Sequence, residues 1–273
     1  SDVCSSDLIN NGVDTLAASD LLPLPPEQLE TVPLQVVNVG RNLGVAAALN
    51  QGVRHLEERG CTLAWSFDQD SLPATDALQA LLAASQSDVS IAAWAPSIHE
   101  IGRNQPMPFL VADATGKLHV QAISGTQEVT AAITSGLLFR IDVWQATGGA
   151  LEPLFIDHVD TEWCWRLRNT GWRILAVPDA SVEHQLGEPG PRLAWLLGPR
   201  VTVRPPLRTY YMLRNGWLLG RMTYAPAGWR RYQNWQAAKI IAVALLHGPE
   251  RRGQLRAILQ AVRDVRNGQP WTR

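Results

Sequence analysis

Hydrophobic and polar positions in the first hundred residues alternate between a strand-like and a helix-like period. Residues 34–39 are rich in β-branched side chains, and residues 44–58 then carry apolar side chains at helical spacing. An apolar run ends at Asp68, a helix is predicted over about residues 75–84, and residues 89–94 form a further apolar run. Strands that alternate with helices predict an α/β fold with a doubly wound, mostly parallel sheet flanked by helices.

The pattern changes in the second half of the chain. Short alternating runs over residues 106–134, broken at residues 113–116, predict a hairpin or added strands. Residues 160–169 predict a helix and residues 172–177 a strand. The chain from residue 206 onward is predicted to be mostly helical, with arginines on its polar faces.

These patterns divide the chain into three parts. Residues 1–8 lack an initiator Met and a clear period, so we expect a foreign or disordered leader there. We expect one sheet domain over residues 9–205 and a helical C-terminal extension over residues 206–273.

Composition excludes several classes of protein. With 273 residues, 46% of them hydrophobic, the chain can bury a full core, and a net charge of -1 gives no overall field to recruit nucleic acid. The three cysteines, Cys4, Cys61 and Cys164, are too widely spaced for a disulfide framework or a zinc knuckle. The apolar run over residues 240–246 is far shorter than the roughly 20 residues that cross a bilayer. We therefore expect a cytoplasmic protein that binds no nucleic acid.

Two acids follow the apolar run of residues 63–67. Asp68 and Asp70 stand at the carboxyl end of a predicted strand, where ligands bind in open α/β sheets. An Asp-x-Asp turn offers two hard oxygen ligands for a divalent cation that also holds the phosphate oxygens of a substrate. The alternative is a solvated turn that caps the next helix at residues 73–75.

A second acidic cluster lies at the start of the helix predicted near residue 160. Asp157, Asp160 and Glu162 are candidates for a general base that takes a proton from an attacking hydroxyl. Acids in the first turn also stabilise a helix through capping and the helix dipole, which is the alternative. His184 ends a later strand and offers a ligand that would complete a cation site begun at Asp70.

Together these motifs resemble the ordered landmarks of the family 2 glycosyltransferases, and among these the bacterial rhamnosyltransferases. The landmarks are residues 42–52, 68–71, 135–136, 155–166, 184 with 187, and 208–215. Residues 10–13, Asn-Asn-Gly-Val, stand where family members show a turn similar to Asp-Asn-Gly-Ser. Because the first strand and helix of the family would precede this turn, the resemblance implies a catalytic domain that lacks them.

The resemblance implies a GT-A fold, a Rossmann-like sheet that binds a nucleotide sugar together with Mg²⁺ or Mn²⁺. By this resemblance Asp68 faces the nucleoside, while Asp70 and His184 bind the metal. Asp160 matches the base of the family and Glu162 the second acid of that motif. The further donor-binding positions are Asn10, Asn11, Asn42 and Asn50, and the positions for the sugar or the acceptor are Ser135, Gly136, Asp157 and Trp163.

The implied reaction is an inverting transfer in bacterial cell-envelope polysaccharide biosynthesis. The sugar would be L-rhamnose from dTDP-L-rhamnose, and the acceptor a polysaccharide or a lipid-linked glycan. One alternative is an inactive or noncatalytic relative that binds glycan or nucleotide. Another is a haloacid-dehalogenase-like phosphohydrolase, which also uses a strand-end Asp-x-Asp but needs a positioned lysine; after Ser71 the chain has only Lys117 and Lys239.

One interpretation of the helical extension is a peripheral contact with the inner face of the plasma membrane. Tryptophans and arginines on its helices would form an amphipathic surface next to a lipid-linked acceptor. The alternative is an ordinary helical cap with solvated arginines. The residues concerned are Trp217, Trp229, Trp235, Arg221, Arg230 and Arg231. The sequence leaves the oligomeric state open.

Overall fold

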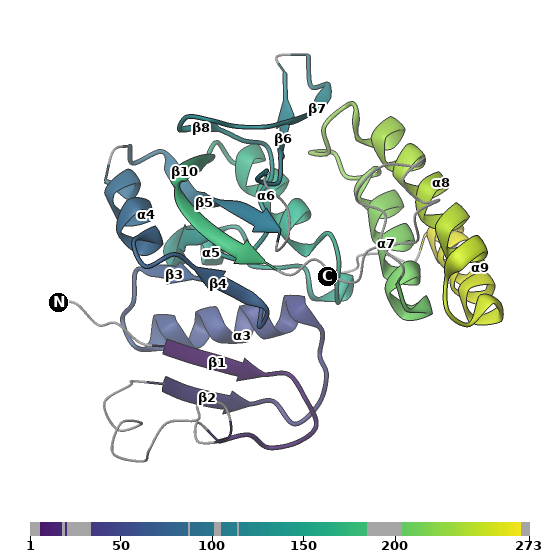
Figure 1. Ribbon diagram of the computed structural model, residues 1–273, viewed down its shortest axis with the longest axis horizontal. Coiled ribbons are helices and arrows are strands. Elements are labelled where there is room, and N and C mark those ends of the chain that lie inside the picture. The colour runs from purple at the N-terminus through teal and green to yellow at the C-terminus, as the bar shows by residue number, and fades with distance from the viewer. Residues whose placement is uncertain are drawn as a thin grey trace.

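The computed structural model describes residues 6–17, 20, 34–86, 88–100, 105–113, 115–184 and 204–268. Figure 1 shows a central sheet with helices on its faces and a group of C-terminal helices at one side. The expected α/β class and the helical C-terminal extension are confirmed. Of the landmark residues, Gly187 lies outside the described part of the chain.

The central sheet has two long strands in its middle. Its order is β3 (Leu63–Trp65), β9 (Leu138–Arg140), β5 (Ile91–Glu100), β10 (Arg173–His184) and β4 (Ser71–Pro73), with β8 (Gln127–Glu128) also paired to β10. β5 and β10 are parallel, whereas the pairs β3–β9, β5–β9, β10–β4 and β10–β8 are antiparallel. The sheet is therefore mixed rather than mostly parallel, because strands of two or three residues join it without the long crossover that parallel pairing requires.

A separate pair of parallel strands precedes the central sheet in the chain. β1 (Ser6–Asn10) pairs with β2 (Leu34–Asn38), and α3 (Val45–Glu58) packs against β1. The leader expected over residues 1–8 is thus wrong for residues 6–8, which are strand residues with partners in β2. Residues 1–5 lie outside the described part.

The hairpin expected over residues 106–134 is present. β6 (Phe109–Ala112) and β7 (Leu118–Gln121) are antiparallel. Asp113 organises the turn between them, because its Oδ1 accepts hydrogen bonds from the backbone N–H groups of Thr115 and Lys117.

Helices cover both faces of the central sheet. They are α4 (Ala77–Ser85), α5 (Ile141–Ala146) and α6 (Val159–Asn169), with a 3₁₀ turn over Glu152–Leu154. Leu81 of α4 packs with Ile91 and Trp94 on one face. On the other face α3, α5 and α6 contribute to a larger cluster around Phe139.

Three fully buried aromatic rings form the centre of the larger cluster. The ring of Phe139 lies 4.9 Å from that of Trp144 and 5.5 Å from that of Trp163, and the two tryptophan rings are 4.7 Å apart. Tilted and edge-on contacts of this kind add to the hydrophobic contribution of the buried area. They join the short strand β9 to α5 and α6.

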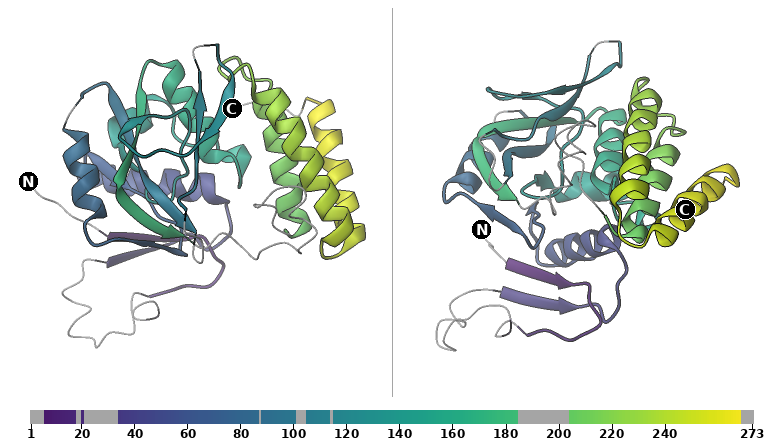
Figure 2. Two further views of the ribbon diagram at one scale, coloured as in Figure 1. Left: turned by 45° about the horizontal axis from the view of Figure 1, so that its top comes forward. Right: turned by 45° about the vertical axis from the view of Figure 1, so that its right-hand side comes forward.

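The C-terminal extension forms a three-helix layer beside the sheet domain (Figure 2). Its helices are α7 (Pro206–Leu219), α8 (Trp229–His247) and α9 (Arg251–Arg266). Trp229 anchors the layer: it is 2% exposed, its ring lies 4.7 Å from that of Trp165 in α6, and its Nε1 donates to the carbonyl of Gly216 at 2.8 Å. Among the described residues, no helix combines the length and apolar character needed to cross a membrane.

Truncation of Trp163 to alanine is expected to destabilise the protein by about 3–5 kcal/mol, because it leaves a cavity between Phe139 and Trp144. Chemical denaturation followed by circular dichroism measures this loss. The matched control is Trp235→Ala, since Trp235 is 64% exposed and its loss should cost less than about 0.5 kcal/mol. Equal losses in the two variants would contradict the central place of Trp163 in the core.

Candidate functional site

Side chains from two distant parts of the sequence meet where strands β3 and β10 end. Asp68 and Asp70 lie in the turn between β3 and β4, and His184 is the last residue of β10, paired with Ser71 of β4. One ligand atom from each of Asp68, Asp70 and His184 lies within 4.8 Å of the others. Two carboxylates and an imidazole are a donor set that suits a divalent cation such as Mg²⁺ or Mn²⁺.

Two serines hold the imidazole of His184 in place. The hydroxyl of Ser71 lies 2.7 Å from His184 Nδ1 and 2.5 Å from the hydroxyl of Ser135. The backbone N–H of Asp68 donates to Ser135 Oγ at 3.4 Å. His184 Nδ1 also lies 3.3 Å from Asp70 Oδ1, so these contacts hold the imidazole against the Asp-x-Asp turn. Sequence reasoning gave Ser71 no role, although it directly follows the Asp-x-Asp turn.

Ser135 and Gly136 form a buried turn rather than an open wall of a binding site. Ser135 is fully buried, which corrects its expected role as a surface for the donor sugar. Gly136 has a φ of +77°, and a Cβ there would come within 2.7 Å of Pro96 and 2.9 Å of Val182. The turn therefore packs tightly on β5 and β10 and brings Ser135 to the cluster of Asp68, Asp70 and His184.

Asp160, in the first turn of α6, lines a cavity of about 1060 Å³. Its Oδ1 accepts hydrogen bonds from the backbone N–H of Thr161 at 2.6 Å and from the Thr161 hydroxyl at 3.2 Å. Burial raises the pKa of Asp160 to about 6, and the charges of Asp68 and Asp157 act in the same direction. Asp160 and Asp68 are thus within electrostatic range of each other.

The cavity lies between the hairpin and the C-terminal helices. Apolar side chains such as Phe109 and Ile133 form much of its wall, and Tyr232 and Lys239 of α8 line the opposite side. Burial lowers the pKa of Lys239. Since Ile133 stands two residues before Ser135, one short segment connects the cavity wall to the cluster of Asp68, Asp70 and His184.

The loop that leads into α6 has a strained backbone. Phe155, Asp157 and His158 have φ angles of 63°, 64° and 64°, which residues with a Cβ rarely adopt. Such conformations persist only where the surrounding structure imposes them. The Nδ2 group of the fully buried Asn215 in α7 lies 2.8–2.9 Å from the carbonyl oxygens of Leu154, Ile156 and Asp157.

The same loop also contacts the start of α3. The carbonyl of Phe155 accepts a hydrogen bond from the backbone N–H of Val45 at 2.6 Å, and the Phe155 ring stacks on Tyr211 of α7. Gly44 has a φ of +85°, and a Cβ at this position would come within 2.6 Å of Phe155. A glycine is therefore required where the loop meets α3.

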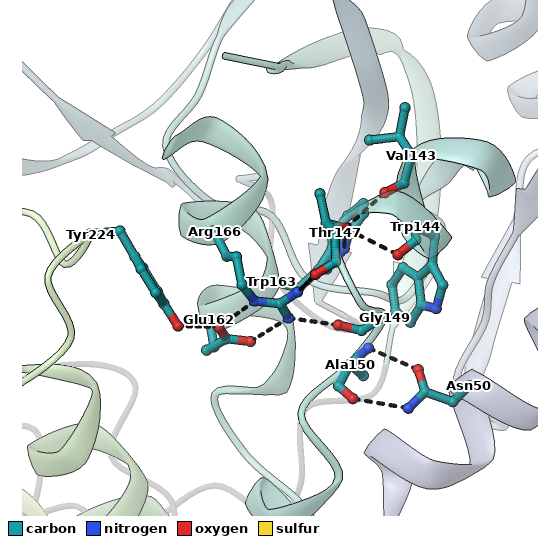
Figure 3. Close-up of polar contacts among 10 residues, drawn as sticks. All are labelled: Asn50, Val143, Trp144, Thr147, Gly149, Ala150, Glu162, Trp163, Arg166 and Tyr224. Atoms are coloured by element: carbon teal, nitrogen blue, oxygen red, sulfur yellow. Dashed lines mark hydrogen bonds and ion pairs between the residues drawn. The ribbon is translucent and has the colours of Figure 1, made fainter. Parts of the chain in front are cut away.

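Glu162, expected to be a second catalytic acid, is fully buried in a polar network (Figure 3). Arg166 donates from Nε and Nη2 to the two carboxylate oxygens of Glu162 at 2.8 Å each, and the Tyr224 hydroxyl donates to Oε1 at 2.5 Å. Arg166 also donates to the carbonyls of Thr147 and Gly149. The structure therefore gives Glu162 a structural role, tying α6 to the turn after α5 and to the segment after α7.

Trp163 also differs from its expected role at the sugar or the acceptor, whereas the expected role of Asp157 remains a prediction. Trp163 is 1% exposed within the aromatic core, and its Nε1 donates to Thr147 Oγ1 at 3.1 Å, so its ring cannot stack on a sugar. Asp157 pairs with Arg208, whose Nε donates to its Oδ1 at 3.2 Å. Helical spacing in the sequence did not reveal which side of α6 faces the core.

The expected donor-binding asparagines mainly connect segments of the protein. Asn50 accepts from the N–H of Ala150 and donates to its carbonyl, which uses both ends of its amide (Figure 3). Asn10 donates to Asn38 Oδ1 at 2.7 Å. Asn11 accepts from the N–H of Leu43 and donates to Asn42. Asn11 and Asn42 thus hold the loops after β1 and before α3 together, and their contact with a donor remains a prediction.

Both the sequence and the fold are similar to those of known glycosyltransferases. The profile of the family described as "Glycosyltransferase like family 2" matches residues 26–198. The dTDP-rhamnosyl transferase RfbF of Shigella flexneri is 30% identical over 196 residues, which make up 71% of this chain and 65% of that protein. The chain therefore spans about two thirds of the length of this relative.

Two solved structures share the fold at low sequence identity. Residues 1–349 of Staphylococcus aureus TarS, in complex with UDP-GlcNAc, match with a TM-score of 0.57 and 12% identity, covering 96% of this chain and 72% of that one. The mannosyltransferase PcManGT of Pyrobaculum calidifontis, in complex with GDP-Man and Mn²⁺, matches with a TM-score of 0.52 and 17% identity, covering 98% and 73%. At these identities the likeness shows the fold alone.

Replacement of Asn215 by leucine is expected to destabilise the protein by about 1–3 kcal/mol, because buried carbonyls of residues 154–157 lose their donor. Amide hydrogen exchange should rise in peptides that cover residues 153–162. The control Asn234→Leu changes an exposed residue of α8 and should stay within about 0.5 kcal/mol. Unchanged exchange in Asn215→Leu would show that the loop is held by other contacts.

The variant Asp70→Asn is expected to bind Mn²⁺ at least about tenfold more weakly, since it removes one charged ligand from the cluster of Asp68, Asp70 and His184. Isothermal titration calorimetry with Mn²⁺ measures the change. Asp76→Asn, at the exposed start of α4, is the matched control and should bind as the parent does. If the two variants bind Mn²⁺ equally, these three side chains do not form the metal site.

Proposed function

Because the chain belongs to glycosyltransferase family 2, we propose that it transfers a sugar from a nucleotide-sugar donor to an acceptor hydroxyl with inversion at the anomeric carbon. It has the GT-A fold of its structural neighbours. The observation that carries the proposal is the carboxylate of Asp160, which lines the large cavity within electrostatic range of Asp68. The family match removes the phosphohydrolase alternative.

Asp160 is the proposed general base. A base that works near neutral pH needs a pKa close to that pH, and burial raises the pKa of Asp160 to about 6. Thr161 holds one carboxylate oxygen through two hydrogen bonds, which leaves the other oxygen available to accept the proton of the acceptor hydroxyl. The acceptor oxygen would then attack the anomeric carbon on the face opposite the leaving nucleoside diphosphate.

The diphosphate would lie at the edge of the sheet where β3 and β10 end. Asp68, Asp70 and His184 are the residues that would hold Mg²⁺ or Mn²⁺ there, and the bound cation neutralises the charge that develops on a leaving diphosphate. Ser71 holds the imidazole through a hydrogen bond at Nδ1, and Ser135 holds the hydroxyl of Ser71. The electrostatic effect of Asp68 on Asp160 supports the assignment of donor and acceptor to neighbouring sites.

The proposed donor rests on the sequence relative, and the proposed acceptor rests on the residues that line the cavity. The similarity to a dTDP-rhamnosyl transferase supports dTDP-L-rhamnose as the donor. Apolar walls with Tyr232 and Gln236 suit the faces and hydroxyls of a sugar ring, so a polysaccharide or a lipid-linked glycan is the proposed acceptor. With a lipid-linked acceptor, the protein would be cytoplasmic and would touch the inner face of the plasma membrane.

Asp160→Asn is expected to reduce transfer at least about 100-fold while donor binding stays within about twofold, because the amide cannot accept the proton. A donor screen with Mn²⁺ and a panel of nucleotide sugars, followed by product detection, measures transfer; calorimetry measures binding. Glu162→Gln is the control variant: it should lower the melting temperature but leave the rate of transfer unchanged. Retained turnover in Asp160→Asn would remove Asp160 from the role of base, and donor binding without transfer in the parent would favour a noncatalytic relative.

The rate of transfer is expected to depend on the ionisation of Asp160. Since only the carboxylate accepts a proton, the rate should fall about tenfold per pH unit below about pH 6 and level off above it. The stability of the protein changes with pH in the opposite direction. Because the pKa of Asp160 is higher in the folded protein than in the unfolded chain, its contribution to the free energy of unfolding is fully present below the unfolded pKa and is lost as the pH rises through about 6. A pH–rate profile together with unfolding curves between pH 4 and 8 tests both, and a flat rate profile would contradict the assignment.

A further inference from the structure

Basic residues are concentrated in the C-terminal helices. Of the 24 basic residues of the chain, twelve lie in residues 204–268, together with two of the 25 acidic residues, Glu250 and Asp264. The net charge of -1 for the whole chain therefore hides a strongly positive helical layer attached to an acidic sheet domain. A layer with this charge attracts an anionic partner even though the whole protein is nearly neutral.

The outward side of α9 combines arginines with leucines. Arg252, Leu255, Arg256, Leu259, Arg263 and Arg266 are all exposed and follow one another at helical spacing. We call these six residues the α9 face. The opposite side of the helix, with Ile258 and Ala261, is buried against the other helices.

The α9 face has no acid of its own. Asp264, the acid within the helix, is half-buried and accepts hydrogen bonds from Tyr210 at 2.6 Å and from Gln260 at 2.9 Å. Within the described part of the chain, no carboxylate lies within ion-pair distance of the four arginines of the α9 face. Their charge is therefore available to a partner.

Exposed apolar side chains continue from the α9 face onto the start of α7. Leu255 and Leu259 are 49% and 60% exposed, and Leu207 of α7 is 62% exposed. A shallow groove of about 660 Å³ lies between α7 and α9, lined by Leu207, Tyr210 and Leu259 with Arg256 and Arg263. Figure 2 shows α9 at the outer margin of the helical layer, away from the central sheet.

We propose that the α9 face, together with Leu207, binds the surface of a membrane that contains anionic phospholipid. Leucines on a helix that lies in the plane of the membrane enter the boundary between headgroups and acyl chains, while arginines beside them reach the lipid phosphates. The combination of exposed leucines with an uninterrupted basic surface fits this partner better than it fits nucleic acid, which offers no apolar layer for the leucines.

This surface differs from the one suggested by the tryptophans of the extension. Trp229 is buried in the contact with the sheet domain. Trp217, Arg221 and Arg230 line a pocket between the three helices, which the α9 face meets only at Arg266. The inference names the surface for the membrane contact in the proposed function, but it rests on the residues of α9 and α7 and not on the catalytic assignment.

Vesicle sedimentation with the full chain tests the proposal. The parent is expected to sediment with vesicles of phosphatidylglycerol and phosphatidylcholine, and far less with pure phosphatidylcholine. The double variant Arg256→Gln/Arg263→Gln should bind the anionic vesicles about 25-fold more weakly, since each arginine near an anionic surface contributes a factor of about five. Leu255→Ser/Leu259→Ser should also weaken binding, and most clearly at high salt, where electrostatic attraction is screened.

The matched control is Arg230→Gln/Arg231→Gln, which removes the same charge from the start of α8 and should weaken binding less than about threefold. Equal losses in the two arginine variants would overturn the assignment to the α9 face, as would equal binding of the parent to neutral and anionic vesicles. A dimer that dissociates in Leu255→Ser/Leu259→Ser, without any vesicle binding by the parent, would identify a second copy of the chain as the partner and overturn the proposal. Transfer to a soluble acceptor should be unchanged in all three variants, so failure of the membrane proposal is distinguishable from failure of the proposed function.

Discussion

The amide of Asn215 is the interaction on which the geometry of the candidate site depends. Its Nδ2 group faces three carbonyls of the loop over residues 154–157, where Phe155, Asp157 and His158 have left-handed backbone conformations. The carbonyl of Leu154 also accepts from the backbone N–H of Ile156, but the carbonyls of Ile156 and Asp157 would lose their buried donor without Asn215, so the loop would relax. Because this loop also bonds to the start of α3 and leads into Asp160, the C-terminal helices take part in building the site.

Two acids in the same helical turn have different roles because of helix geometry. Asp160 and Glu162 are two residues apart on α6, and residues at this spacing point to different sides of a helix. Asp160 faces the cavity, where burial raises its pKa. Glu162 points into the protein, where Arg166 and Tyr224 satisfy both of its oxygens. The hydrogen bonds from Arg166 and Tyr224 to Glu162 fix the helix, whereas Asp160 at the cavity can exchange a proton near neutral pH.

Acidic and basic residues are distributed unevenly between the sheet domain and the helical layer. The sheet domain holds the acids that a cation and a proton-transfer step require, and the helical layer holds half of the basic residues. The cavity lies where the two parts meet, with Asp160 from one and Lys239 from the other. In the functional proposal, an acceptor that reaches this cavity would come from the side of the basic layer.

Among Asp157, Asp160 and Glu162, the family resemblance and not the residue pattern chose Asp160 as the base. Periodicity and residue chemistry in the sequence predicted α3, α4, α6, the hairpin and the helical extension, and they indicated Asp68, Asp70 and His184 as a cation site. These features follow from local spacing and from the cost of placing acids at the end of an apolar strand. The tertiary structure decided the mixed direction of the sheet, because strands of two or three residues carry no signal for their partners. It also decided that Glu162, Trp163 and Ser135 are buried and that Asn50 bonds to the backbone of Ala150. Ser71 and Asn215 support the candidate site through contacts that only the folded chain makes. Which side of a helix is covered, and which distant group satisfies a buried polar atom, depend on contacts between segments that no local pattern encodes.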